Sequence, residues 1–203
     1  MNEITISGKK IGNLEFSHQT KNEKFYAFFL SSARKSGIED IIPCIASEVF
    51  KKKIESISDS KIKLSGEIRT RNVMKDNGKT HLEIFVFIND ISAYENELED
   101  INDVFINGYT CNNILCRQTP LGRQIADMII ACNRRNNKSD YIPCIAWGRN
   151  AVKMSEFENG KNIILTGRLQ SREYTKKIDE ELSEIRIVYE VSANGIEVLN
   201  NEN

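Results

Sequence analysis

Hydrophobic and polar residues alternate in short segments along much of this chain. In residues 3–9, Ile4 and Ile6 fall on one face, and polar residues occupy the other. Alternation with a period of two is typical of half-buried β-strands. Residues 24–31, KFYAFFLS, are rich in aromatic residues and indicate a second strand. The apolar segment IPCIA, at residues 42–46, indicates a third.

The same pattern occurs twice, at an offset of about 100 residues. Residues 40–46 read DIIPCIA, and residues 140–146 read DYIPCIA. Farther along, LSGEIRTR at residues 64–71 lies opposite LTGRLQSR at residues 165–172, so one inserted residue accounts for the shift in offset. Because internal repeats mark repeated structural units, we predict two units of about 100 residues, a common domain size.

We expect the first unit to span residues 1–92 and the second to span residues 103–200, with an acidic linker at residues 93–102. The sequence around the join, residues 89–103, reads NDISAYENELEDIND. It is acidic and has few apolar residues, which suits a solvated linker.

Each unit has the same expected order of elements: three strands, one short helix and two further strands. In the first unit Phe50, Ile54 and Ile57 have helical spacing, and in the second the helix is shorter, around residues 150–157. Residues 124–133 could be a helix, but their alternation and the repeat favour a strand. The expected fourth and fifth strands cover residues 64–71, 82–88, 163–172 and 185–191. The sequence DNG at residues 76–78 is a strong hairpin signal between two of them.

Five strands and one helix in this order fit a small Greek-key barrel, the OB-fold pattern. We therefore predict an all-β protein with two tandem OB-fold barrels, each with one short helix. The periodicity by itself leaves a different five-stranded barrel or a sandwich open.

Aromatic and arginine residues gather on one expected face of the second unit. On its third strand, a period of two places Tyr141 and Trp147 together, with Arg149 two positions further on. Bases stack on flat rings with roughly 1–3 kcal/mol each, and arginines contact phosphates or stack as well. Together with residues of the fourth strand and of the polar loop CNRRNNKSD, the candidate nucleic-acid-binding residues are Tyr141, Trp147, Arg149, Arg168, Gln170, Arg172, Tyr174, Arg134 and Arg135.

Each of these residues also has a structural interpretation. Trp147 could pack in the core or against another subunit, because tryptophan usually buries much of its area. Tyr141 and Tyr174 could be solvated strand residues, and Arg134 and Arg135 could be solvated in their loop. The combination, rather than any single residue, indicates a binding face.

The first unit does not carry the same face. It has Ile41, Ser47 and Val73 where the second unit has its three aromatic residues. Residues 1–100 contain 12 lysines and 3 arginines, and residues 101–203 contain 5 lysines and 8 arginines. Because arginine stacks and forks where lysine does not, we expect the second unit to bind and the first, degenerate unit to be mainly structural. The lysine run that follows Phe50 is either a phosphate contact or a solvated helix face.

Charge and apolar runs narrow the compartment. The formal net charge of −1 does not by itself indicate a nucleic-acid partner. The longest apolar runs are six residues, such as residues 25–30, so we expect no membrane helix, which needs about 20. The N-terminal sequence MNEITISGKK lacks the apolar core of a signal peptide, which makes the cytoplasm the expected compartment.

The residues available for chemistry argue against an enzyme, a cofactor or a metal site. Five cysteines without a secretion signal are better explained as buried free thiols than as disulfides. Cys111 and Cys116 have the spacing of half a zinc site, but no second CxxC pair exists and the histidines, His18 and His81, lie far away in sequence. The chain has no phosphate-binding P-loop and no HExxH motif.

Three stretches of the second unit carry a family resemblance. They are PLGRQIADMIIACNRRNNKSDYIPCIAWGRNA, ILTGRLQSREYTKK and VYEVSANGIEVL. Over residues 103–199 the chain resembles the bacterial single-stranded DNA-binding protein family. The resemblance implies OB-folds that coat single-stranded DNA in replication, recombination and repair, without catalysis and with little sequence preference.

The resemblance also implies particular contacts and an assembly. The family's aromatic binding positions match Tyr141, Trp147 and Tyr174, and its basic positions match Arg149, Arg168 and Arg172. Many members bring four OB-folds together, so two per chain imply a homodimer associated with the nucleoid. Members recruit replication or repair proteins through a flexible tail with an acidic tip. This chain ends at VLNNEN without such a tip, so recruitment of those partners is left open.

A second class of function fits the same fold. The neutral net charge and the missing acidic tip are compatible with an OB-fold protein-interaction adaptor, of the kind found in primosomes. The two hypotheses differ in whether Tyr141, Trp147 and Tyr174 contact bases or another protein.

Overall fold

The fold comes from a computed structural model, which describes residues 1–57, 60–74, 78–96, 98–111, 114–177 and 183–199. The hairpin expected from the DNG sequence lies at the edge of these residues, since 76 and 77 fall outside them.

Five strands form the first barrel: β1 (Asn2–Thr20), β2 (Glu23–Ala33), β3 (Glu39–Ser47), β4 (Lys61–Met74) and β5 (Thr80–Tyr94). The order around the barrel is β1-β2-β3-β5-β4, and β1 closes it by pairing with both β2 and β4. The parallel pairing of β3 with β5 is the crossover of a Greek key. Gly8 makes the closure possible, because a Cβ at this position would lie 2.0 Å from the carbonyl oxygen of Ser31.

The second barrel repeats this arrangement with β6 (Asn102–Thr110), β8 (Gln124–Asn133), β9 (Ser139–Trp147), β10 (Asn162–Lys177) and β11 (Ser183–Val198). The order is β6-β8-β9-β11-β10, again closed by its first strand and again with a parallel pair, β9 with β11. A short strand that the sequence did not predict, β7 (Leu115–Gln118), extends the sheet beyond β8. The prediction of two five-stranded OB-fold barrels is confirmed.

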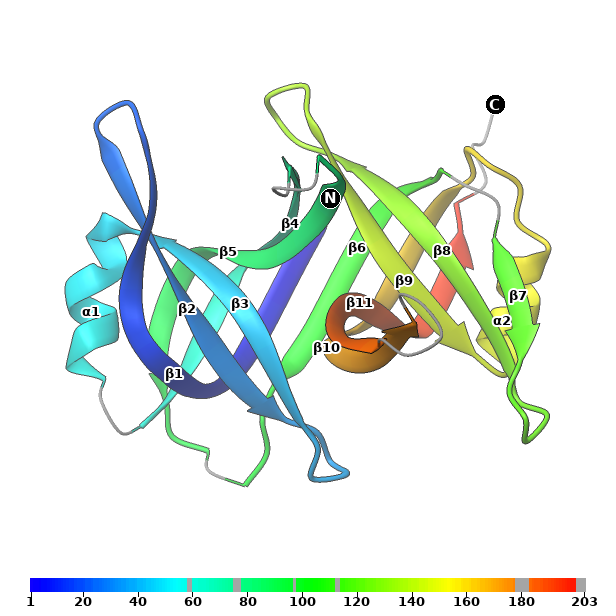
Figure 1. The fold of residues 1–203 in the computed structure, drawn as a ribbon, viewed down its shortest axis with the longest axis horizontal. Coiled ribbons are helices and arrows are strands. Elements are labelled where there is room, and N and C mark those ends of the chain that lie inside the picture. The colour runs from blue at the N-terminus through cyan, green and yellow to red at the C-terminus, as the bar shows by residue number, and fades with distance from the viewer. Residues whose placement is uncertain (58–59, 75–77, 97, 112–113, 178–182, 200–203) are drawn as a thin grey trace.

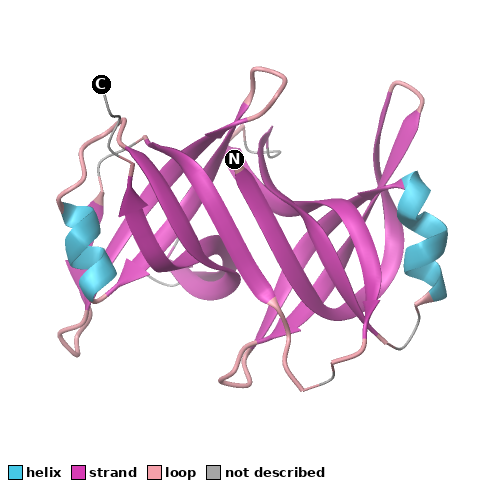
Figure 2. Ribbon diagram, turned by 180° about the vertical axis from the view of Figure 1, so that it is seen from behind, coloured by secondary structure: helices cyan, strands magenta, loops and turns pink. Residues whose placement is uncertain are grey.

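Each barrel has its helix between the third and fourth strands, as expected. In the first barrel the 3-10 turn η1 (Glu48–Phe50) leads into α1 (Lys51–Ser56), and in the second α2 (Arg149–Ser155) takes this place. The two helices lie at opposite outer ends of the molecule (Figure 2). Ile54 of α1 is fully buried, because the helix covers one end of the apolar barrel interior.

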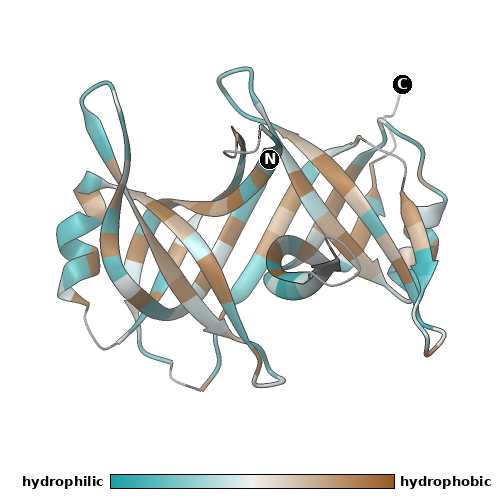
Figure 3. Cartoon of the chain, in the orientation of Figure 1, coloured by the Kyte–Doolittle hydropathy of each residue, from teal (hydrophilic) through white to brown (hydrophobic). Residues whose placement is uncertain are grey.

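The core follows the alternation seen in the sequence. Along β4, residues at every second position are buried, among them Ile62, Leu64 and Ile68. The buried residues of the two barrels form one connected cluster, in which Ile4 and Val104 both take part. Apolar and polar residues alternate along the strands in Figure 3 as a period of two requires.

A strand pair joins the barrels into one continuous sheet of 11 strands. β1 and β6 run antiparallel, with Ile4 opposite Val104 at the centre and Asn2 opposite Ile106 at one end (Figure 1). Ile4 and Val104 are equivalent positions of the repeat, offset by 100 residues. The two barrels are therefore related by an approximate two-fold axis through this pair.

The segment between β5 and β6 is in part held against the first barrel. Asp100 pairs with the Nζ atom of Lys61 at 2.9 Å and accepts a hydrogen bond from the backbone N–H of Ala33 at 2.8 Å. Its side chain is almost fully buried. This part of the acidic segment is anchored, and not solvated as expected, because a carboxylate that finds a cation and an N–H donor can be buried.

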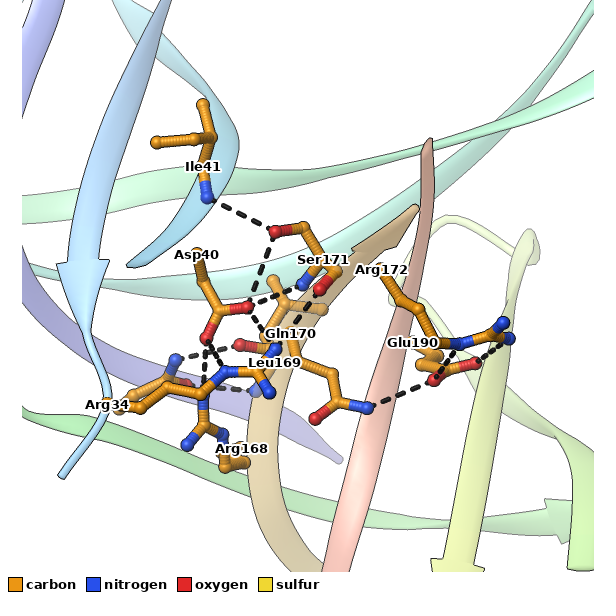
Figure 4. A network of polar contacts seen from close by, with 10 residues as sticks. Arg34, Asp40, Ile41, Arg168, Leu169, Gln170, Ser171, Arg172 and Glu190 are labelled. Carbon is orange, nitrogen blue, oxygen red and sulfur yellow. Dashed lines mark hydrogen bonds and ion pairs between the residues drawn. The ribbon is translucent and has the colours of Figure 1, made fainter. Parts of the chain in front are cut away.

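Two reciprocal clusters of polar contacts reinforce the joint between the barrels. In the first, Asp40 binds Arg34 of its own unit and accepts a hydrogen bond from the backbone N–H of Ser171 at 2.8 Å, across the interface (Figure 4). Arg34 donates to the carbonyl oxygen of Ser171 at 3.1 Å, and Arg168 forms an ion pair with Asp40.

The second cluster is the two-fold mate of the first. Asp140 accepts from Arg134 at 2.7 Å and from the backbone N–H of Thr70 at 2.6 Å. Arg134 donates to the carbonyl oxygen of Thr70 at 2.9 Å, and Arg69 adds a second cation at 3.1 Å from Asp140. Both carboxylates are buried, so their charges are compensated by arginines from both units.

Asp140→Ala is expected to lower the free energy of unfolding by about 2–4 kcal/mol, because it leaves Arg134 and Arg69 without their shared counter-ion in a buried interface. Urea denaturation followed by circular dichroism measures this loss. The matched control is Asp127→Ala, which removes the exposed pair with Arg117 and should cost about 0–1 kcal/mol. Equal losses in the two variants would contradict a structural role for Asp140.

Candidate nucleic-acid interface

Trp147 lies at the end of β9, on the outside of the second barrel. It pairs across the sheet with Ile125 of β8 and is half-buried. The guanidinium carbon of Arg123 lies 5.0 Å from the centre of the indole ring, within the range of a cation–π interaction. Arg123 was not among the expected site residues. Its signal in the sequence was its place just before β8, one residue diagonal to the strand partner of Trp147.

Tyr141 lies at the other end of the same strand. Its side chain is 49% exposed, and its backbone N–H donates to the Oγ1 atom of Thr70 in the first barrel at 2.9 Å. Six residues separate Tyr141 from Trp147, which is about 20 Å along a strand. The structure thus leaves one accessible ring at the barrel interface and one at the outer end of β9.

Arg149 and Arg135 flank this strand at its two ends. Arg149 is the first residue of α2 and Arg135 belongs to the loop between β8 and β9, and both side chains are exposed. Both are therefore accessible to a phosphate group beside the two rings.

The fourth-strand residues differ in how accessible they are. Gln170 is buried and donates from Nε2 to Glu190 at 3.0 Å. Arg172 donates to the same carboxylate at 3.3 and 3.4 Å, but its side chain remains partly exposed (Figure 4). Tyr174 is half-buried and lies opposite Arg186 of β11.

Arg134 and Arg168 have structural partners. Both belong to the polar clusters between the barrels, Arg134 with Asp140 and Arg168 with Asp40. Burial lowers the pKa of the Arg168 guanidinium, an effect that the nearby Asp40 carboxylate opposes. The structure therefore assigns Arg134, Arg168 and the buried Gln170 to contacts inside the protein, and brings the exposed candidates together around β9.

The first barrel does have an aromatic surface, contrary to expectation. His18 stacks on Phe25 with ring centres 4.8 Å apart, and Phe25 lies 5.8 Å from Phe87. Arg71 lies over Phe85 at 5.4 Å. These rings belong mainly to β2 and β5, whereas the rings of the second unit belong to β9 and β10. Comparison of equivalent positions missed them for this reason, although KFYAFFLS and IFVF carried the signal.

Neither a metal cluster nor a membrane-spanning helix is found in the described part of the chain. Those residues contain no group of three or more His, Cys, Asp or Glu side chains able to hold a metal ion. No helix among them is both long and apolar enough to cross a bilayer.

The cysteines divide into two groups. Cys44, Cys132 and Cys144 are buried, and burial raises the pKa of the Cys132 thiol to about 12. Cys111 and Cys116 are exposed, so the expectation of buried thiols is wrong for these two. They lie on either side of the start of β7, outside the barrel core.

We expect a thiol reagent such as Ellman's reagent to modify two cysteines rapidly in the native protein at about pH 8, and five after denaturation. Only an accessible thiol with an appreciable thiolate fraction reacts, and burial removes both conditions for the other three. Absorbance of the released thiolate counts the reacted groups. Rapid native modification of three or more would show that a barrel core is open.

These features define a chain of two OB-fold barrels with exposed rings and arginines on one strand of the second. Residues 101–199 match the model of the single-strand binding protein family. Through its second barrel, the chain belongs to this family, which confirms the resemblance in the sequence.

Individual relatives agree. Single-stranded DNA-binding protein 1 of Streptococcus pyogenes is 28% identical over 97 residues, which cover 44% of this chain and 75% of that protein. The single-stranded DNA-binding protein of Clostridium tetani is 30% identical over 84 residues, which cover 38% of this chain and 58% of that protein. The solved structure of the wild-type single-stranded DNA binding protein from Thermus aquaticus superposes with a TM-score of 0.75 at 19% identity, covering 100% of this chain and 95% of that one. This last likeness shows that both barrels share its fold.

Proposed function

We propose that this protein binds single-stranded DNA without catalysis and with little sequence preference, through the face around β9. The observation that carries the proposal is the placement of Tyr141 and Trp147 on one exposed strand with arginines at each end. The names of the relatives support the same ligand.

The chemistry of this face suits unpaired bases. The rings of Tyr141 and Trp147 offer stacking surfaces that accept any base, because every base has a flat π-face. Arg123 holds one face of the Trp147 ring, which leaves the other face for a base. Arg135 and Arg149 supply cations for the phosphates, and Arg172 and Tyr174 extend the surface along β10. Stacking and phosphate contacts do not read base edges, so sequence preference is low.

The biological role follows from this chemistry. Binding of this kind protects exposed strands during replication, recombination and repair. We infer that the protein acts in the cytoplasm at the nucleoid, and that a homodimer brings four OB-folds onto one strand. Its first barrel stabilises the second through the polar clusters at Asp40 and Asp140.

An OB-fold adaptor that binds another protein is the second candidate. The specific observation in its favour is an exposed apolar stretch on β11, with Ile185 68% exposed and Ile187 beside it. In that case the rings of β9 would contact a partner protein instead of bases.

Binding of oligo-dT is expected to quench the fluorescence of Trp147, the only tryptophan, while a duplex of equal length leaves it unchanged. Trp147→Ala should weaken oligo-dT binding by about 1–3 kcal/mol, and Trp147→Phe, which keeps a ring, should lose less. Anisotropy of a labelled oligonucleotide measures both affinities. If Trp147→Ala binds like the wild type, Trp147 is part of the scaffold, and absence of any binding favours the adaptor.

Affinity should fall with salt in proportion to the phosphates that are neutralised. For about four arginine contacts, the slope of log affinity against log salt is about −3. Arg149→Ala should reduce its magnitude by about 0.7. The matched control is Arg168→Gln, which changes a guanidinium already paired with Asp40 and should leave the slope unchanged. The opposite result would place Arg168 on the DNA and Arg149 off it.

A further inference from the structure

A groove of about 1040 Å³ separates the outer faces of the two barrels. Phe29, Pro43 and Phe85 line it from the first barrel, and Ile129, Pro143 and Tyr189 line it from the second. Pro43 and Pro143 are equivalent positions of the repeat, so the groove lies between the corresponding faces of the two units.

The groove is continuous with the face proposed to bind DNA. Arg172 and Tyr174, which extend that face along β10, both line it. Arg71, the equivalent of Arg172 in the first unit, lines it from the other side. A strand that follows the proposed face past Tyr174 therefore reaches the first barrel.

Phe29 is the accessible ring on the first-barrel side. It is 46% exposed, and it lies between Ile11 of β1 and Pro43 of β3. Arg71 lies over the neighbouring ring of Phe85. An exposed phenylalanine in a groove is a stacking surface that costs the protein free energy in water unless something covers it.

The charges indicate which part of a strand the groove would take. Arg71 pairs with Glu83 at 2.7 Å, and Arg172 pairs with Glu190 at 3.3 Å. Because these arginines are neutralised by carboxylates within the groove, it offers little net attraction for phosphate. It suits bases, with the phosphates directed outward to solvent.

We propose that single-stranded DNA leaving the second barrel crosses this groove and stacks a base on Phe29. The first barrel is then a binding unit as well as a structural one. The occupant is single-stranded DNA, because the groove continues the proposed interface and presents flat rings. This inference rests on the proposed function of the second barrel, and no family match covers the residues that carry it.

The direct test moves the single tryptophan into the groove. In the variant Trp147→Phe with Phe29→Trp, an oligo-dT of about 30 nucleotides, long enough for two OB-folds, should quench the fluorescence strongly. The matched control is Trp147→Phe with Phe16→Trp. Phe16 is 60% exposed on the same barrel, but Glu15 and Ser17 line the groove and Phe16 does not. Equal quenching of both reporters, or of neither while the oligonucleotide binds, would overturn the inference.

Affinity gives an independent test on the otherwise unchanged chain. Phe29→Ala should weaken binding of an oligo-dT of about 30 nucleotides by about 5- to 150-fold, and should not change binding of one of about 8 nucleotides, which the second barrel can hold alone. Phe29→Tyr should restore the loss, and Phe16→Ala should show none. Because the groove is neutralised, the salt slope should stay the same in Phe29→Ala.

The outcomes separate this inference from the proposed function. If the wild-type chain binds neither oligonucleotide, the proposed function fails. If it binds both and Phe29→Ala is unaffected, only the groove inference fails. If Phe29→Ala changes the molar mass in sedimentation but not the affinity, the groove is covered by a second copy of the chain, and this also overturns the inference.

Discussion

The antiparallel pairing of β1 with β6 is the constraint on which the rest of this molecule depends. Each strand is the first of its barrel and closes that barrel by pairing with its own second and fourth strands. The same two strands also pair with each other, with Ile4 opposite Val104. Backbone hydrogen bonds at this joint fix the register, and a slip of one residue would turn Ile4 and Ile6 away from the core. The two barrels therefore have a defined relative orientation.

That orientation decides which charges are free to act. The approximate two-fold axis brings Asp40 against β10 and Asp140 against β4, where each binds arginines. Arg34, Arg134 and Arg168 are used in these clusters, so part of the arginine surplus of the second unit serves assembly. The arginines that remain accessible lie around β9. A net charge of −1 is thus compatible with a local basic surface, because internal pairing removes charges of both signs from the exterior.

The two-fold relation also creates the groove between the barrels. Equivalent outer faces of the repeat lie on its two sides, with Arg71 opposite the region of Arg172. Neither unit has this groove alone. Divergence between the repeats then changed its chemistry, since Phe29 and Phe85 of the first unit stand where the second has Ile129 and Glu190. The two halves of one groove became aromatic on one side and mixed on the other.

The sequence by itself determined the local elements and the fold class. Alternation along the strands, the amphipathic helix at Ile54 and the repeat of IPCIA each depend on neighbours in the chain, and the structure has all of them. The family resemblance and the accessible rings Tyr141 and Trp147 could be found in the same way, because their spacing on one strand fixes the face on which they lie. The tertiary structure alone decided the fate of Arg134, Arg168 and Gln170. Their partners, Asp140, Asp40 and Glu190, come from other strands or from the other barrel, and no local pattern records contacts between residues as far apart as 40 and 168. The aromatic surface of the first barrel was hidden for a similar reason, since its rings meet across strands and have no counterparts in the second repeat.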